Sequence, residues 1–387
     1  MIRVDALEGP LDMGDFITVA RRIYRADPRW VEQPEEQQRR RLDVTRAPFW
    51  RRAEREVLVA HAGSVRHAPV GRLVVFRDHL HEAQSGGEPL AFFGLFEASD
   101  DPEVAAALME RARAWARERG LRRLRGPISF TMLEEVGVLM EGFDRPPRLR
   151  TAYNPPYYAP LLEAAGLRVA REYGGYDWSS WDLPLPPAPL AQRALRAGEH
   201  GIRIEPFDPQ HLDEAVRAFV AVYDDALRGS WGFTPLPFEE AAEIFESVAN
   251  FGEPRLVWQA SVDGDPAGFI LALPDLNEAL VRTRRGFGLF SLGKALYLKG
   301  GVRTLRVLSM AVRARYRRHN LAGHLVYRAW QAAMDAGIVM AEFSPVDLAD
   351  EAMTRLLHRI GCRRTKRWAV FEDPAAPGDL DRLAVGR

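Results

Sequence analysis

The chain has 387 residues, and its 53 Lys and Arg residues balance 53 Asp and Glu residues, so the formal net charge is zero. Apolar residues make up 47% of the chain and charged residues 27%, which is ordinary for a globular protein and excludes a disordered chain or a polycation that coats nucleic acid. No apolar run approaches the ~20 residues that span a bilayer, the first residues lack the apolar core of a signal peptide, and the single cysteine, Cys362, excludes an internal disulfide. We therefore expect a cytoplasmic protein of about two or three domains, with no metal site.

The first half of the chain alternates predicted strands with two predicted helices. Asp101 followed by Pro102 is typical of a helix start, and Gly120 is typical of a helix end. Gly166 ends the second helix in the same way. The predicted strands are 56–60, 71–76, 91–97, 121–128, 167–171 and 173–178, and the predicted helices are 102–119 and 157–165.

A proline-rich segment then divides the chain. Four prolines fall within the six residues from Pro184 to Pro189, and neither a helix nor a central strand tolerates that pattern. We predict a semi-rigid spacer over 183–199, which includes a short helix at 190–196, between domains at 1–182 and 200–387.

The second half repeats the order of elements found in the first. Its predicted strands are 201–204, 255–260, 267–273, 305–312, 338–343, 363–367 and 368–372, and its predicted helices are 321–336 and 351–360. Gly120 and Gly166 are further apart than the matching Gly337 and Gly361, so the first half carries an insertion between residues 129 and 156. We predict an α/β protein with two related domains, each a twisted mixed sheet flanked by helices.

The junction between the strand 305–312 and the helix 321–336 is the strongest candidate for a binding site. The first amides of a helix have no partner within the helix, and together with the positive end of the helix dipole they bind anions. Asn320 can adopt the left-handed conformation that otherwise favours glycine. We expect a pyrophosphate here, and four arginines add positive charge around the turn: Arg313, Arg315, Arg317 and Arg318.

This junction resembles the GNAT superfamily of acyl-CoA-dependent N-acyltransferases. The family motif Arg/Gln-x-x-Gly-x-Gly/Ala follows the fourth strand, and Arg317–Ala322 matches its first and last positions, with Asn320 in place of the central glycine. The segment 350–362 resembles a further stretch of the family, and the first half follows the same order of elements. The resemblance implies a tandem GNAT protein in which acyl-CoA contacts Met310, Ala311, Val312, Arg317, Arg318, His319, Asn320, Leu321, Ala322 and Gly323.

The resemblance also indicates where catalytic groups should lie. In the family, a backbone amide of the fourth strand polarises the thioester carbonyl, and the matching residues are 309–311. A tyrosine of the last helix often protonates the leaving thiolate, but Leu357 occupies that position here. The remaining candidates are Glu342 as a base and Tyr316, Ser344 and His358 as proton donors.

A second cluster lies in the first half and has two interpretations. Glu97, Asn154 and Tyr157 either line a pocket for the acceptor substrate or belong to a structural core of aromatic residues in which Glu97 caps a turn. The turn that matches the basic junction, 100–103, carries three carboxylates that would repel a pyrophosphate. We therefore expect acyl-CoA on the second half and not on the first.

The apolar segment 286–299 is predicted either to pack on the sheet as a helix, or to line an acyl-chain groove or touch a membrane surface. The sequence as a whole predicts an N-acyltransferase that moves an acetyl or longer acyl group from CoA to a small-molecule or lipid-like amine. No nucleic acid partner is expected, and a homodimer is left open. The competing hypothesis is a tandem protein that binds acyl-CoA, or serves a structural role, after losing its catalytic acid.

Overall fold

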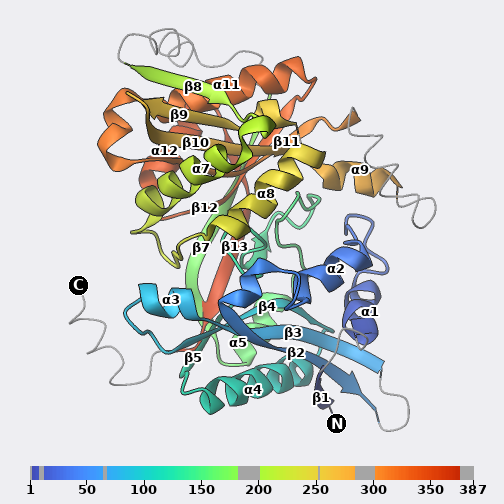
Figure 1. Cartoon of the computed structure of the whole chain (residues 1–387). Helices are drawn as coiled ribbons and strands as arrows, with labels where there is room; N and C mark the ends of the chain where they lie inside the picture. The colour runs from blue at the N-terminus through green and yellow to red at the C-terminus, as the bar shows by residue number, and fades with distance from the viewer. Residues whose placement is uncertain are drawn as a thin grey trace. The chain divides into compact units, whose positions relative to one another are not determined.

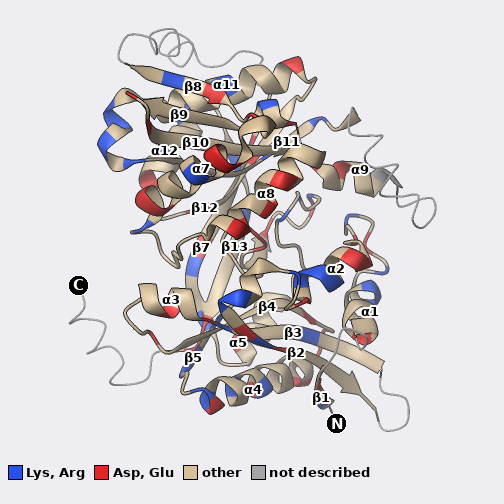
Figure 2. Cartoon of the chain, viewed as in Figure 1, with Lys and Arg blue, Asp and Glu red and all other residues tan. Residues whose placement is uncertain are grey.

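The computed structural model describes residues 2–7, 13–63, 68–181, 201–251, 253–283 and 301–374, and the chain forms two compact units. Unit 1 consists of Met1–Arg145, Ala152–Glu172 and Trp368–Arg387, and unit 2 consists of Pro146–Thr151 and Tyr173–Arg367. The predicted spacer over 183–199 and the apolar segment 286–299 lie outside the described residues. Figure 2 shows acidic and basic residues on the helices of both units, in keeping with the zero net charge.

Unit 1 is a mixed sheet with helices packed on it (Figure 1). Its strands are β1 (Ile2–Ala6), β2 (Ala53–Ala62), β3 (Ala68–Asp78), β4 (Leu90–Ala98), β5 (Arg123–Gly126), β6 (Val138–Glu141) and the end of β13 (Arg363–Glu372). Its helices are α1 (Met13–Ile23), α2 (Glu35–Leu42), the 3-10 helix η2 (Pro48–Arg51), α3 (His79–Gln84), α4 (Pro102–Glu118) and α5 (Tyr158–Ala164). The strand order is β1-β2-β3-β4-β5-β13, and β4–β5 is a parallel pair among antiparallel neighbours.

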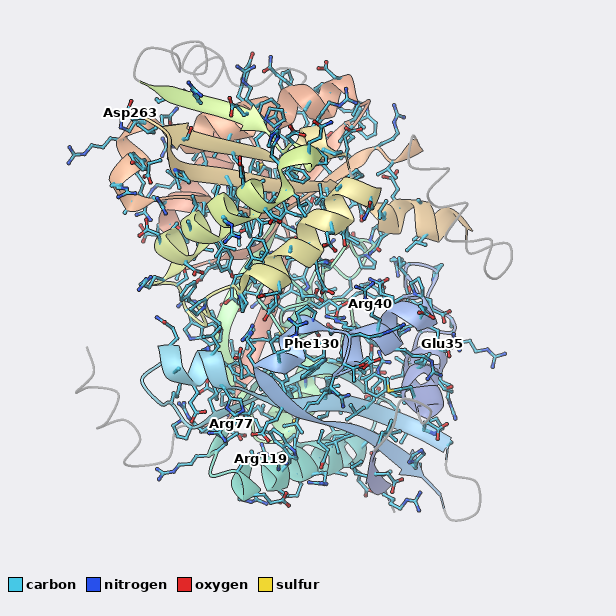
Figure 3. All side chains as sticks on the ribbon, in the orientation of Figure 1. Glu35, Arg40, Arg77, Arg119, Phe130 and Asp263 are labelled. Carbon is cyan, nitrogen blue, oxygen red and sulfur yellow. The ribbon has the colours of Figure 1, made fainter. Side chains whose placement is uncertain are left out.

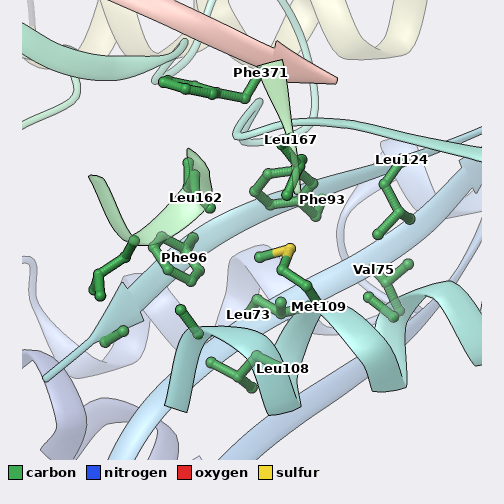
Figure 4. Close-up of a cluster of buried hydrophobic side chains, with 14 of the residues drawn as sticks. Leu73, Val75, Phe93, Phe96, Leu108, Met109, Leu124, Leu162, Leu167 and Phe371 are labelled. Carbon is green, nitrogen blue, oxygen red and sulfur yellow. The ribbon is translucent and has the colours of Figure 1, made fainter. Parts of the chain in front are cut away.

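Helix α4 begins and ends as the sequence predicts. The Asp101 side chain accepts a hydrogen bond from the Glu103 amide at 2.9 Å, and Pro102 occupies the first turn. The helix buries Leu108 and Met109 against β3, in the cluster that Figure 4 shows. Burial of apolar side chains against the strands therefore fixes α4 in unit 1.

Unit 2 has the same kind of architecture. Its strands are β7 (Arg168–Ser179), β8 (Ile202–Pro206), β9 (Trp258–Val262), β10 (Asp265–Pro274), β11 (Thr304–Val312), β12 (Met340–Asp347) and the start of β13. Its helices are η4 (Pro209–His211), α7 (Leu212–Leu227), α8 (Phe238–Phe251), η5 (Pro254–Leu256), α9 (Leu276–Thr283), η7 (Ala314–His319), α11 (Leu321–Asp335) and α12 (Glu351–Arg359). The strand order is β7-β12-β11-β10-β9-β8, and β11–β12 is a parallel pair among antiparallel neighbours.

Helices α7 and α11 cover opposite faces of the unit 2 strands. Side chains alternate between the two faces along a strand. On β10, Phe269 packs against Phe219 of α7 with ring centroids 4.4 Å apart, whereas the neighbouring Ile270 joins the core that includes Leu325 of α11. Figure 1 shows α7 and α8 passing in front of these strands.

Each strand and each helix that the sequence predicts within the described residues is present, with shifted ends. The strands predicted at 167–171 and 173–178 are one strand, β7, and those predicted at 363–367 and 368–372 are one strand, β13. Several elements were not predicted, namely β1, β6, α1, α2, α3, α7, α8 and α9. No described helix has the length and apolar character that crossing a membrane requires.

Candidate functional site

Two neighbouring parallel strands part at the centre of unit 2. β11 and β12 are paired only from Thr304–Met340 to Val307–Phe343, although both strands continue for several residues. On its other edge β12 pairs with β7 both before and beyond that point, and beyond it β11 has β10 as its only described strand neighbour. From Leu308 onward, one edge of β11 therefore lacks a described strand beside it.

A bulge marks the place where the strands part. In the β10–β11 pair, Leu271 lies opposite Ser309 and Ala272 lies opposite Val307, so Leu308 is an extra residue in β11. A bulge interrupts the hydrogen-bond ladder and redirects the backbone groups beside it. The bulge therefore lies directly beside residues 309–311, where the sequence analysis places the amide that would polarise the thioester carbonyl.

The turn after β11 has the conformation that an anion site needs. Asn320 has φ 54° and ψ 30°, the left-handed conformation that the sequence predicts, and it separates η7 from α11. The amides of Gly323 and His324 donate back to the Asn320 carbonyl. The amides of Leu321 and Ala322 precede these two bonds, which is where helix amides bind anions.

The four arginines of this turn fall into two pairs. Arg313 donates to both carboxylate oxygens of Asp265 at 3.2 Å, and Arg315 pairs with the same carboxylate. Arg317 and Arg318 are exposed, and neither side chain makes an ion pair or hydrogen bond with another residue that the structure describes. Only the second pair is thus free to meet a bound anion.

Tyr316 is engaged by the same carboxylate. Its hydroxyl donates to Asp265 Oδ2 at 2.6 Å, and this hydrogen bond raises the pKa of Tyr316 and lowers the pKa of Asp265. A phenol whose proton is held by a carboxylate is a weaker acid than a free one. The structure therefore gives Tyr316 a partner other than a leaving thiolate.

Glu342 lies in a buried charge cluster on β12. Lys366 Nζ is 2.8 Å from its Oε2 atom, and the Ser344 hydroxyl donates to its Oε1 atom at 2.6 Å. Burial raises the pKa of Glu342, but Lys366, Arg306 and Arg148 outweigh burial and hold that pKa at about 2. A carboxylate with such a pKa is a weak base at neutral pH.

The insertion in the first half contributes a segment to this cluster. Residues 146–151 belong to unit 2, where Arg148 lies 3.2 Å from Asp275 and the Leu149 amide donates to Asp275 at 2.8 Å. Lys366 also donates to the Pro146 carbonyl at 2.9 Å. Glu342 and its neighbours therefore anchor the segment 146–151 within unit 2.

The last helix supplies no buried acid. Leu357, at the position of the family tyrosine, is fully buried in the core of unit 2. His358 is exposed and meets Tyr176 edge-on, with ring centroids 5.6 Å apart. Consecutive residues of a helix are turned by about 100° from each other, so His358 cannot take the direction of Leu357.

In unit 1 the parallel strands β4 and β5 also part, but there the residues that follow β5 lie along the free edge of β4. β4 and β5 are paired over only three residues each. Beyond them the Ile128 amide donates to the Phe93 carbonyl at 2.8 Å, and the Leu95 amide donates to Ser129 Oγ at 3.3 Å. A Cβ atom on Gly94 would lie 2.3 Å from the Ile128 carbonyl oxygen, so this close approach requires glycine.

The residue after Ser129 packs within a cluster of aromatic side chains. Phe130, labelled in Figure 3, packs 5.5 Å from the Phe49 ring and 4.8 Å from the Trp50 ring, measured between centroids. The Arg41 guanidinium lies over the Phe130 ring. The segment that fills the β4 edge is therefore held in place by packing.

The cluster that the sequence offers as an acceptor pocket, Glu97, Asn154 and Tyr157, makes its contacts inside unit 1. Tyr24 and Tyr158 donate to Glu97 Oε2 at 2.8 and 2.5 Å, and burial raises the pKa of the Glu97 carboxyl. The Tyr157 hydroxyl donates to the Ala98 carbonyl at 3.1 Å. These contacts favour the structural interpretation of the cluster.

Asn154 joins the turn after the insertion to β6. It accepts the Leu139 amide at 2.7 Å, and its Nδ2 atom donates to the carbonyls of Pro155 at 2.9 Å and of Leu139 at 3.3 Å. Both Asn154 and Leu139 are buried. Asn154 thus satisfies backbone groups that water cannot reach.

Asn154→Ala is expected to lower the free energy of unfolding by about 2–3 kcal/mol, because it leaves the buried Leu139 amide without an acceptor. Tyr157→Phe, which removes one hydrogen bond, is the matched control, with an expected loss of about 1 kcal/mol. Chemical denaturation measures both. An Asn154→Ala protein as stable as the wild type but inactive would instead support a role in acceptor binding.

An apolar cavity of about 50 Å³ lies between the unit 2 sheet and α11. Val307 and Phe343, the last pair before the strands part, are among its lining residues. The sequence did not predict this cavity, because its walls come from segments far apart in the chain. Among the described residues, no three His, Cys, Asp or Glu side chains gather as a metal ion would require.

Comparison with known proteins shows a family match within unit 2 and relatives that match nearly the whole chain. Residues 243–362 match the model of the acetyltransferase (GNAT) family. The bacterial ceramide synthase of Caulobacter vibrioides is 29% identical over 379 residues, which is 96% of this chain and 97% of that protein. Protein YghO of Escherichia coli is 27% identical over 372 residues, which is 93% of this chain and 92% of that protein.

Solved structures show the same fold at low sequence identity. A tandem GNAT protein from the clavulanic acid biosynthesis pathway has a TM-score of 0.58 and 15% identity, covering 98% of this chain and 100% of that one. A GCN5-related N-acetyltransferase from Sphaerobacter thermophilus has a TM-score of 0.53 and 14% identity, covering 98% of both chains. The coverage extends over both halves of the chain.

Proposed function

We propose that the chain is an acyl-CoA-dependent N-acyltransferase, because residues 243–362 match the acetyltransferase (GNAT) family model and a tandem GNAT protein shares its fold. Unit 2 would bind acyl-CoA, and the acceptor would be the amine of a small-molecule or lipid-like compound. The observation that carries this proposal is the parting of β11 and β12 at the bulge of Leu308, directly before an anion-binding helix start.

Each part of this junction has a role toward the donor. The amides of Leu321 and Ala322 would hold the pyrophosphate, and Arg317 and Arg318 would neutralise its charge. The free edge of β11 would pair with the amide groups of the pantetheine arm. An amide beside Leu308 would polarise the thioester carbonyl as negative charge develops on its oxygen.

The transfer itself forms one bond and breaks one. The acceptor amine attacks the thioester carbon, the C–S bond breaks, and the nitrogen loses a proton while CoA leaves as thiolate or thiol. A thiol has a pKa of about 8.5, so the thiolate is a good leaving group without a strong acid nearby. The buried Leu357 is therefore compatible with turnover.

The acceptor class is supported by the relatives. The Caulobacter protein, which matches nearly the whole chain, is named as a ceramide synthase. A ceramide is the amide of a long-chain amino alcohol. We therefore extend the proposal to an amine on a lipid-like acceptor, which a membrane surface would present.

A second candidate function is acyl-CoA binding without transfer. It is favoured by one set of observations: Leu357 replaces the family acid, and Tyr316 and Glu342 are engaged by other groups. In that case the protein would hold a thioester but have no group that moves protons.

Thiol release from several acyl-CoAs, measured with a panel of amines that includes a long-chain amino alcohol, tests the proposal. We expect CoA release that depends on one class of amine and yields the amide. Binding of acyl-CoA without release of thiol in the presence of every amine would favour the second candidate. Failure to bind any CoA thioester would contradict both.

A further inference from the structure

The apolar cavity of unit 2 lies directly beside the point where β11 and β12 part. Leu305 and Val307 of β11 and Phe343 of β12 line it, together with Ala329 and Ala333 of α11. Val307 and Phe343 form the last pair before the strands separate. The cavity therefore begins at the inner end of the proposed thioester site.

The two faces of these strands have opposite character. Arg306 and Glu342 are paired neighbours between the residues that line the cavity, so alternation turns them to the other face of the sheet. Both are buried, and Glu342 belongs to the charge cluster with Lys366. An apolar chain that reaches the centre of the sheet thus meets charge on one face and the cavity on the α11 face.

Helix α11 links the cavity to the proposed position of CoA. Its first residues, Leu321 and Ala322, carry the amides assigned to the pyrophosphate, and its middle turns, including Ala329 and Trp330, form a wall of the cavity. A donor that runs from the helix start along β11 brings its acyl group to Val307. The tail of that acyl group then continues into the cavity.

The cavity suits a hydrocarbon better than it suits water. At about 50 Å³ it exceeds the roughly 10–15 Å³ that one water requires, and its lining is aliphatic and aromatic. Water in such a space finds few hydrogen-bond partners, and the side chains around it lack dispersion contacts on one side. Methylene groups would restore those contacts.

We propose that this cavity receives the hydrocarbon tail of the donor acyl group, so that the protein uses acyl-CoA with a chain of several carbons in preference to acetyl-CoA. The proposal rests on the proposed function, since it takes CoA to bind at the start of α11. It places the donor tail, and not that of the acceptor, between α11 and the sheet.

The test is an affinity series in the absence of acceptor, with CoA, acetyl-CoA, hexanoyl-CoA and dodecanoyl-CoA titrated into the full chain by calorimetry. We expect the affinity to rise by about fourfold for each buried methylene until the cavity is full. Equal affinities along the series, with CoA itself bound, would overturn the inference and leave the proposed function standing. No binding of any CoA compound would overturn both.

Substitutions in the α11 wall of the cavity test whether the acyl tail of the donor lies there. Ala329→Phe fills the cavity and is expected to reduce the affinity for dodecanoyl-CoA to that for acetyl-CoA, a loss of at least tenfold. Ala332→Phe, on the same helix but outside the cavity lining, is the control and is expected to keep the wild-type series. If Ala329→Phe does not fold, Ala333→Leu adds less volume to the same wall. A chain-length dependence that survives both fillings would contradict the proposed position of the tail.

Discussion

Replacing both Arg317 and Arg318 with glutamate is expected to weaken CoA binding at least about 100-fold. Hydrogen bonds to charged groups contribute about 1.5–3 kcal/mol each, and both side chains are exposed and unengaged by other described residues. Glutamate would in addition repel the pyrophosphate. Calorimetric titration of CoA into the wild type and the double variant measures the change.

A second double variant separates this local effect from the change in net charge. Arg355→Glu together with Arg359→Glu alters the net charge equally on the exposed side of α12. We expect its affinity for CoA to stay within a few-fold of the wild type at physiological ionic strength, since distant exposed charges are screened. Unchanged affinity in the Arg317→Glu/Arg318→Glu protein would remove the assignment of the pyrophosphate to this turn.

Lys366→Met is expected to lower the free energy of unfolding by about 3–5 kcal/mol, because it removes the nearest cation from the fully buried Glu342 carboxylate. The variant also loses the hydrogen bond to the Pro146 carbonyl. Chemical denaturation at neutral pH measures the loss. Adding Glu342→Gln to Lys366→Met should recover part of it, since no buried charge is then left uncompensated; no recovery would show that Lys366 acts only through packing.

The buried charge cluster around Glu342 also predicts that the free energy of unfolding falls at acid pH. The pKa of Glu342 is about 2 in the folded chain, below its ordinary value of 4.5. Its contribution is therefore complete above about pH 4.5 and is lost as the pH falls toward 2. In Glu342→Gln this part of the pH dependence should be absent, and an unchanged acid profile would contradict the role given to Glu342.

Features with a local cause could be predicted from the sequence. Asp101 and Pro102 place the start of α4, and Asn320 takes the left-handed conformation where the family motif has glycine. The helices α7 and α8 could have been found in the same way. In α7, Val216, Phe219 and Tyr223 are all buried and follow the spacing of an amphipathic helix.

Features that depend on distant partners could not be predicted. Asp265 accepts hydrogen bonds from Arg313, Arg315 and Tyr316, which lie some fifty residues away in the chain. Lys366 reaches Glu342 from another strand. Nothing in the local sequence around these residues distinguishes a side chain held by a partner from one that is free for a ligand, so the base and acid candidates could be judged only in the folded chain.

Amide hydrogen exchange with and without acyl-CoA tests the central claim most directly, since it reports where bound ligand protects the backbone. We expect protection of residues 308–323, at the edge of β11 and the start of α11. Residues 93–103 of unit 1, where the chain already satisfies the matching strand edge, should exchange at the same rate with and without ligand. Protection of 93–103 in place of 308–323 would contradict the account.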